Sequence, residues 1–172
     1  MLDIVLSMTA VLGGAVDGSH HALIHYSSPD NRSDVSYDFN SINTYTEIAQ
    51  YISTQDWETY FGISDLDRGL HLGLEHVFTA SGGDRAAAPN YVVLIGDGYF
   101  DTTFECCPPP FNTAASLRRE SDIWAVDIGL DSRLDNLYAI CNSTHNVYPA
   151  ARSHEMAEDI LKDLKHKCSM PI

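Results

Sequence analysis

Basic residues are scarce in this chain. Lysine and arginine together number 10 against 24 aspartates and glutamates, which gives a formal net charge of -14. A protein binds a polyanion by displacing counterions with clustered lysine and arginine, and this sequence has no such cluster. The deficit therefore excludes nucleic acid and anionic membrane surfaces as expected partners.

Long apolar runs are also lacking. No stretch approaches the roughly 20 apolar residues that a membrane-spanning helix needs, so we expect no membrane insertion. The first residues lack the basic segment of a secretory signal peptide. A chain of 172 residues with 44% hydrophobic and 20% charged residues has the composition of one soluble globular domain.

Cysteine is sparse and lacks the C-x-x-C spacing of a zinc site. The two adjacent cysteines would bridge each other only with strain, so separate partners or free thiols are expected. Two Asn-x-Ser/Thr sequons, at Asn31 and Asn142, could accept glycans and favour an extracellular setting. The disulfide candidates are Cys106, Cys107, Cys141 and Cys168.

Hydrophobic periodicity predicts strands and helices in alternation. Residues 22–39 read as an antiparallel pair, and the alternation of Val35, Tyr37 and Phe39 with polar residues is typical of a half-exposed edge strand. Alternating strands and helices predict an α/β fold with a doubly wound, mostly parallel sheet and one antiparallel edge strand. The expected helices cover 2–12, a short segment from 44, 66–77, 111–120, 134–140 and 153–164, and the later strands 91–95, 123–128 and 147–148.

The most informative segment runs from Tyr91 through Ile95 into Gly96-Asp97-Gly98. Five apolar residues in succession predict a strand covered on both faces, as in a parallel sheet. Such sheets bind ligands at the carboxyl ends of their strands. Asp97 is therefore a candidate for metal or phosphate chemistry, and a plain Asp-Gly turn is the alternative.

In order along the chain, these segments resemble the von Willebrand factor type A domain. The likeness covers nearly the whole sequence, and no single piece of it is diagnostic. It rests on Asp17-Gly18 before 22–27, Asp38-Phe39-Asn40, 92–98, 114–118, 123–129 and the helix that stops at Cys168. The resemblance implies a single non-enzymatic adhesion or matrix-type binding module, with the Rossmann-like fold of that family.

The resemblance also implies a metal-ion-dependent adhesion site built from three loops. Carried over by position, the third loop supplies Asp97 and the second supplies Ser64, whose alternative role is a helix N-cap. The Asp-x-Ser-x-Ser motif of the first loop occurs nowhere in the sequence. We therefore expect Mg²⁺ to bind weakly or not at all, because the site is incomplete.

The same likeness has consequences for the fold and the partner. The strand that precedes the first helix in the family has no counterpart here, so we expect an N-terminally incomplete domain over 1–172 whose pair at 22–39 lacks its neighbour. The expected partner is an extracellular or matrix protein that offers an acidic residue.

An enzyme is the competing hypothesis. Gly96-Asp97-Gly98 with Asp101 also fits the Mg²⁺ motif of haloacid-dehalogenase-type phosphatases, and Asp65 and Asp67 imitate their nucleophile motif. Only about 30 residues separate the two motifs, and Arg68-Gly69 replaces the expected Gly-Thr. The sequence therefore favours the binding module. The eight histidines show no metal-ligand spacing on a helix and are expected to be scattered polar residues.

Overall fold

The computed structural model describes residues 2–13, 19–27, 33–42, 44–54, 64–100 and 108–169. The elements are α1 (Leu2–Leu12), β1 (Leu23–His25), β2 (Asp34–Tyr37), α2 (Tyr45–Thr54), α3 (Leu66–Leu72) with the π-helical turn η2 (Gly73–Val77), β3 (Tyr91–Gly96), α4 (Phe111–Leu117), β4 (Asp122–Asp127), α5 (Leu134–Cys141), β5 (Val147–Pro149), the 3-10 turn η3 (Ala150–Arg152) and α6 (Ser153–Ser169). Each predicted helix and strand has its counterpart among them.

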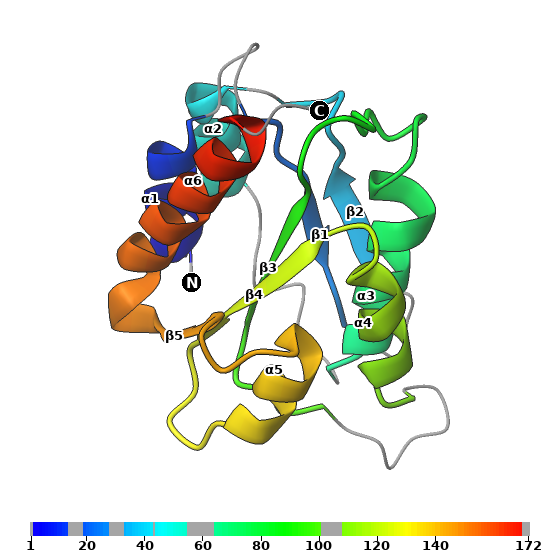
Figure 1. Ribbon diagram of the computed structural model, residues 1–172, viewed down its shortest axis with the longest axis vertical. Helices are drawn as coiled ribbons and strands as arrows, with labels where there is room; N and C mark the ends of the chain where they lie inside the picture. Colours follow the sequence, from blue (N-terminus) through cyan, green and yellow to red (C-terminus); the bar gives the residue numbers. More distant parts are fainter. Residues whose placement is uncertain are drawn as a thin grey trace.

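The α/β prediction is confirmed, with strands and helices in alternation. Strands β3, β4 and β5 form a parallel sheet in that order, and β1 pairs with β2 in an antiparallel ribbon. Helices α1 and α6 cover one side of the strands, and α3 and α4 cover the other (Figure 1). No helix among the described residues has the length and apolar character needed to cross a membrane.

Side chains of β3 and β4 pack into a separate core on each face. Leu94, Ile123 and Ala125 join the cluster that α3, α4 and α5 complete. On the opposite face Val126 packs with residues of α1 and α6, namely Met8, Met156, Ala157 and Ile160. A strand with cores on both faces needs a continuous apolar run, as β3 has. This is why the strand could be predicted from the sequence.

The outer edge of β3 has no neighbouring strand among the described residues. The carbonyl of Asn90 accepts from the Asp122 amide at 2.9 Å, and that of Gly96 accepts from the Ile128 amide at 3.2 Å. Because residues of a parallel strand alternate between its two neighbours, the even-numbered residues face β4. The backbone groups of Tyr91, Val93 and Ile95 therefore face away from it, toward the space on the β1 side.

A charged network fixes α6 across the beginning of β3. The Tyr91 hydroxyl donates to Asp163 at 2.8 Å, and Lys167 pairs with Asp163 at 2.8 Å and also with Asp122. The Lys167 ammonium, which hydrogen-bonds the carboxylate, lowers the pKa of Asp163. The network holds α6 at the end of the strand opposite to Asp97.

His21, just before β1, couples stability to pH. Burial lowers the pKa of its imidazole below the ordinary 6.5, although a hydrogen bond to the Gly13 backbone opposes the shift. Its Nε2 is buried without a hydrogen-bond partner among the described residues. The unfolded chain therefore binds the proton more tightly, so stability is complete above 6.5 and falls as the pH drops toward the folded pKa.

We expect the melting temperature to fall between about pH 7 and pH 5, where carboxylates remain ionised. Burial also lowers the pKa of His25, so His21→Gln should remove part of this slope. His154→Gln is the control, because that side chain is 62% exposed on the outer surface of α6. Thermal unfolding across the pH range checks the prediction, and an unchanged slope in His21→Gln would contradict it.

Candidate functional site

Asp97 lies in the turn that follows β3, at the carboxyl end of the parallel sheet. Its side chain is exposed, and its Oδ1 accepts a hydrogen bond from the Tyr99 amide at 2.9 Å. Gly98 is buried and has φ of +71°, a conformation that glycine adopts without steric cost. The glycine thus turns the chain sharply and leaves the second oxygen of Asp97 facing solvent.

The loop before α5 holds this turn in place. The Arg133 amide donates to the Asp97 carbonyl at 2.7 Å, and the Asn136 side chain donates to the Gly98 carbonyl at 2.9 Å. A Cβ on Gly98 would lie 2.5 Å from the Arg133 carbonyl oxygen. The turn therefore has little freedom to move against α5.

A second carboxylate ends β4 beside the first. Asp127 accepts from the Gly129 amide at 3.0 Å and from the Ser132 hydroxyl. A Cβ on Gly129 would lie 2.5 Å from both the Asp97 Cβ and the Ser132 Oγ. The two loops are thus in direct contact, and Asp127 is occupied in fixing its own loop. We name these loops, with the starts of α4 and α5, the rim.

Tyr26 closes the rim on the side of β1. Its hydroxyl donates to the Ile95 carbonyl at 3.4 Å, and its ring packs against Gly69 of α3. Burial, with a smaller contribution from the Asp97 charge, raises the pKa of Tyr26 to about 12. The phenol therefore stays neutral and bridges β1 to the unpaired edge of β3.

Ser64 and Asp65 precede α3. Asp65, not Ser64, is the N-cap, because its carboxylate accepts from the Arg68 amide at 3.1 Å. The alternative role of Ser64 as the cap is therefore wrong. Within the described part of the chain, no hydrogen bond joins Ser64 to Asp97, and a shared metal site for the two remains a proposal.

A partly buried polar cluster joins α3 to the start of α4. The Thr113 hydroxyl donates to Asp67 Oδ1 at 2.5 Å and lies 3.2 Å from His71 Nε2, which is 3.6 Å from the other Asp67 oxygen. Asp67 is 8% exposed. From the sequence, Asp67 is considered as part of the phosphatase-like motif and is not connected to Thr113. The i,i+4 spacing of Asp67 and His71 was the available signal.

Donors for a divalent metal are few at the rim. Over residues 2–13, 19–27, 33–42, 44–54, 64–100 and 108–169, no group of three or more His, Cys, Asp or Glu side chains could hold a metal ion. Asp127 and Asp67 are occupied by their hydrogen bonds, and Asp97 offers one oxygen. The described side chains alone therefore do not fit the several oxygens that Mg²⁺ requires.

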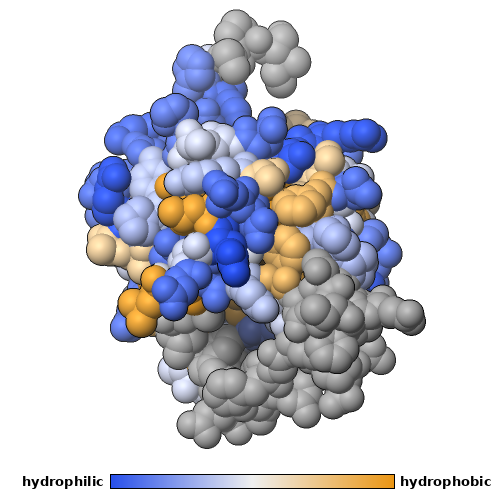
Figure 2. Space-filling model, turned by 90° about the horizontal axis from the view of Figure 1, so that it is seen from below, coloured by the Kyte–Doolittle hydropathy of each residue, from blue (hydrophilic) through white to orange (hydrophobic). Residues whose placement is uncertain are grey.

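Exposed apolar side chains gather at the rim. Of the six exposed large hydrophobic residues in the described ranges, five follow β3 or β4 or begin α4 or α5, and Tyr45 of α2 is the exception. Leu130 is fully exposed, at 103%. Figure 2 views the molecule from the end where β3 terminates and shows apolar surface between polar side chains. The five are Tyr99, Phe111, Ile128, Leu130 and Leu134.

The described modification and disulfide candidates lie in or after α5 and near the end of α6. Asn142 is exposed and caps α5 with φ of +54°. Cys141 is a buried free thiol whose pKa burial raises to about 12, and Cys168 is an exposed free thiol. Asn31, Cys106, Cys107 and Asp101 lie outside the described residues.

Comparison with known proteins identifies a family. The model of the von Willebrand factor type A domain matches residues 1–163. No curated protein sequence matches the chain. One structural match is proximal thread matrix protein 1 from the mussel byssus, with a TM-score of 0.76 and 18% identity over 94% of this chain and 41% of that one. Another is the manganese-loaded Plasmodium vivax TRAP protein, with a TM-score of 0.73 and 11% identity over 90% of this chain and 62% of that one.

A third match is the von Willebrand factor type A protein from Catenulispora acidiphila (TM-score 0.66, 16% identity, 95% of this chain and 38% of that one). A further structure of the byssus protein has zinc in its metal-ion-dependent adhesion site (MIDAS) motif. It matches with a TM-score of 0.74 and 17% identity over 93% of this chain and 41% of that one. The chain therefore covers less than two thirds of each of these matched proteins. At these identities the likeness shows the fold.

Proposed function

We propose, because this chain belongs to the von Willebrand factor type A domain family, that it is a non-enzymatic protein-binding module that docks its partner on the rim. One observation carries the proposal: an exposed carboxylate, Asp97, lies among exposed apolar side chains on loops fixed to the sheet. Apolar surface rimmed by polar groups is typical of protein docking sites.

The partner that we propose is an extracellular or matrix protein that offers an acidic residue. The matched structures include a byssus matrix protein and the TRAP protein, which supports a matrix or adhesion setting. The sequons and cysteines favour the same location. At a net charge of -14, however, the chain repels an acidic partner unless a cation intervenes.

A divalent cation at Asp97, with Ser64 as a second oxygen ligand, would offset that repulsion. Two of the matched structures hold zinc and manganese, which supports a divalent ion at such a site. The described donors are too few for tight binding, so we propose weak affinity for Mg²⁺, with a dissociation constant on the order of 1 mM. When bound, such an ion would attract the acidic residue of the partner to a surface that otherwise repels it.

The phosphatase alternative receives no support from the geometry. Asp65 caps α3, and Asp67 is buried and accepts from Thr113, so both carboxylates serve local hydrogen bonds instead of being presented as a nucleophile. The family assignment favours a binding module.

Binding to matrix proteins tests the proposed function. Immobilised collagen, laminin and fibronectin serve as probes, with surface plasmon resonance recorded in Mn²⁺ and again in EDTA. We expect cation-dependent binding to at least one probe. Leu130→Asp should weaken it about tenfold or more, because it places a charge in the apolar docking surface.

Two further variants distinguish a docking role from a general effect. Asp97→Asn removes the proposed metal ligand and should abolish the difference between Mn²⁺ and EDTA. Tyr45→Ser changes an exposed apolar residue of α2, outside the rim, and should leave binding unchanged. If none of the probes binds, or if Leu130→Asp binds as well as the wild type, the proposal is wrong.

A further inference from the structure

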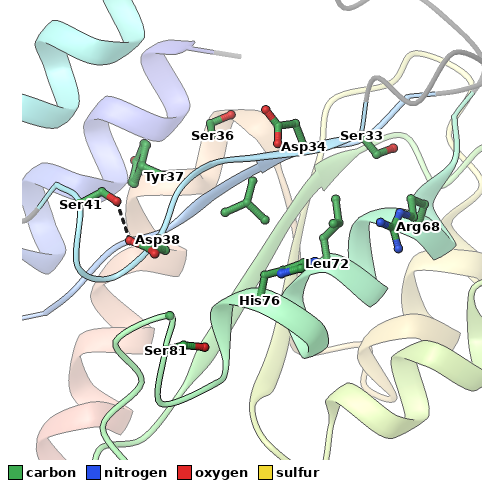
Figure 3. A pocket seen from close by; sticks show the side chains of 12 residues that line it. Ser33, Asp34, Ser36, Tyr37, Asp38, Ser41, Arg68, Leu72, His76 and Ser81 are labelled. Carbon is green, nitrogen blue, oxygen red and sulfur yellow. Dashed lines mark hydrogen bonds between the residues drawn. The ribbon is translucent and has the colours of Figure 1, made fainter.

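A groove lies between β2 and the helical segment formed by α3 and η2, apart from the rim loops. Its volume is about 670 Å³. Figure 3 shows Leu72 and His76 directed from the helical segment toward β2, with Arg68 at the Ser33 end and Ser81 at the Asp38 end. The twelve lining residues come from β2 and its flanks, the helical segment and the loop at Ser81-Gly82.

One wall of this groove is a strand with a vacant edge. Within the described ranges β2 pairs with β1 alone. In an antiparallel pair, alternate residues direct both backbone groups away from the partner strand. The outer side of β2 therefore presents amides and carbonyls to a further strand. The Phe39 amide donates to the Gly82 carbonyl at 3.1 Å, so the loop joins this edge just after β2 and closes that end of the groove.

The opposite wall supplies an apolar surface. Leu72 is buried at 5% exposure, and it lines the groove together with the half-buried Val35 of β2. An edge strand opposite a helix, with apolar side chains between them, is the arrangement in which proteins capture extended peptides by adding a strand. Backbone hydrogen bonds then give affinity, and the pockets for alternate side chains give specificity.

The charges of the side chains that line the groove indicate which kind of peptide it binds. Arg68 is already paired with Glu75 at 3.2 Å, whereas Asp38 lines the groove without an ion pair to a described lysine or arginine side chain. Asp38 Oδ1 accepts from the Asn40 amide at 3.0 Å and the Ser41 hydroxyl at 2.5 Å, which leaves its other oxygen for a ligand. The groove is therefore acidic at its Asp38 end.

We propose that this groove binds an extended, basic peptide segment, which pairs with the outer edge of β2, places an apolar side chain between Val35 and Leu72 and directs a lysine or arginine toward Asp38. At about 3.3 Å per residue, the wall from Ser33 to Asp38 accommodates a segment of roughly six or seven residues. Unlike the rim, which is proposed to bind an acidic partner through a cation, this groove binds a basic segment and needs no cation. The proposal does not depend on the proposed function.

Titration with synthetic peptides tests the proposal. The probe is the capped heptapeptide Thr-Val-Lys-Val-Lys-Val-Thr, and the comparison peptide has glutamate in place of both lysines. In amide nitrogen–proton spectra recorded in EDTA, we expect the lysine peptide to shift the amides of Val35, Tyr37 and His76. The glutamate peptide should bind at least about tenfold more weakly, because it meets the acidic lining.

Variants at the groove and at the rim complete the test. Ser81→Trp fills the groove from an exposed loop position and should abolish binding, while Asp38→Asn should weaken it about tenfold. Because Asp38 also fixes its own loop, Ser81→Trp is the decisive variant. Leu130→Asp, which disrupts the rim, should bind the peptide as the wild type does.

Three results would overturn the proposal. These are equal affinity for the two peptides, shifts confined to the rim amides of Gly98 and Gly129, and undiminished binding by a folded Ser81→Trp variant. A chain that binds the lysine peptide in the groove but none of the matrix probes would disprove the proposed function alone.

Discussion

Gly98→Ala is expected to destabilise the protein by about 3 to 5 kcal/mol. Two costs add at this position. A φ of +71° is unfavourable for any residue with a Cβ, at about 1 to 2 kcal/mol. The new Cβ would also lie 2.5 Å from the Arg133 carbonyl oxygen and 2.9 Å from the Leu137 Cγ, so the turn and α5 would have to separate.

Gly13→Ala is the matched control, since it isolates the first cost. Gly13 has nearly the same φ, +72°, but a Cβ there would meet no heavy atom within 4 Å. We expect it to cost about 1 kcal/mol. Urea unfolding of both variants measures the difference. If both variants lose the same free energy of unfolding, the contact between the Asp97 turn and α5 is loose. The rim would then lack the rigidity that the proposed function requires.

The rim shows how far sequence reasoning reaches. The apolar run of β3 and the glycines around Asp97 predicted an exposed carboxylate at the end of a buried strand, because both signals are local. Asp127 also lies at the end of a buried strand, yet its carboxylate accepts hydrogen bonds from Gly129 and Ser132. Asp127 lacks the flanking glycines of Asp97, but its hydrogen bond with Ser132 depends on how the following loop folds, which the local sequence does not show.

Long-range partners were not accessible from the pattern. Tyr26 and Ile95 are 69 residues apart, and Asp67 and Thr113 are 46 apart. The exposure of the apolar side chains at the rim could not be predicted from the pattern either. Leu134 fits the apolar period of a helix and was assigned to α5 on that ground, although it is 39% exposed. Periodicity identifies a helix but does not show whether anything covers its first turn.

The division of the strands into two sheets has a physical consequence for β3. Its length and apolar composition are those of a central strand, but the structure gives it one strand neighbour in the described residues. Five of its six residues are only half-buried, and Leu94 is the exception, while Ile123, Ala125 and Val126 of β4 are buried at 0 or 1% exposure. The free edge therefore accounts for exposure that composition alone does not predict.

A pair of proline substitutions tests that assignment. Leu94 directs its amide to β4, so Leu94→Pro removes a ladder hydrogen bond and should cost at least about 3 kcal/mol. Val93 directs its amide to the free edge, where proline removes no ladder hydrogen bond, as edge strands tolerate. Leu94→Ala and Val93→Ala, measured alongside, account for the lost side chains.

After the alanine costs are subtracted, Leu94→Pro should remain strongly destabilising, whereas Val93→Pro should lose about 1 kcal/mol or less. Urea unfolding followed by far-ultraviolet circular dichroism measures both. Equal large losses would mean that the Val93 amide has an acceptor on its outer side, and that β3 is then a central strand. A small loss at Val93 alone requires that the two sheets stay apart, with Tyr26 as the bridge that reaches Ile95 across the space between them.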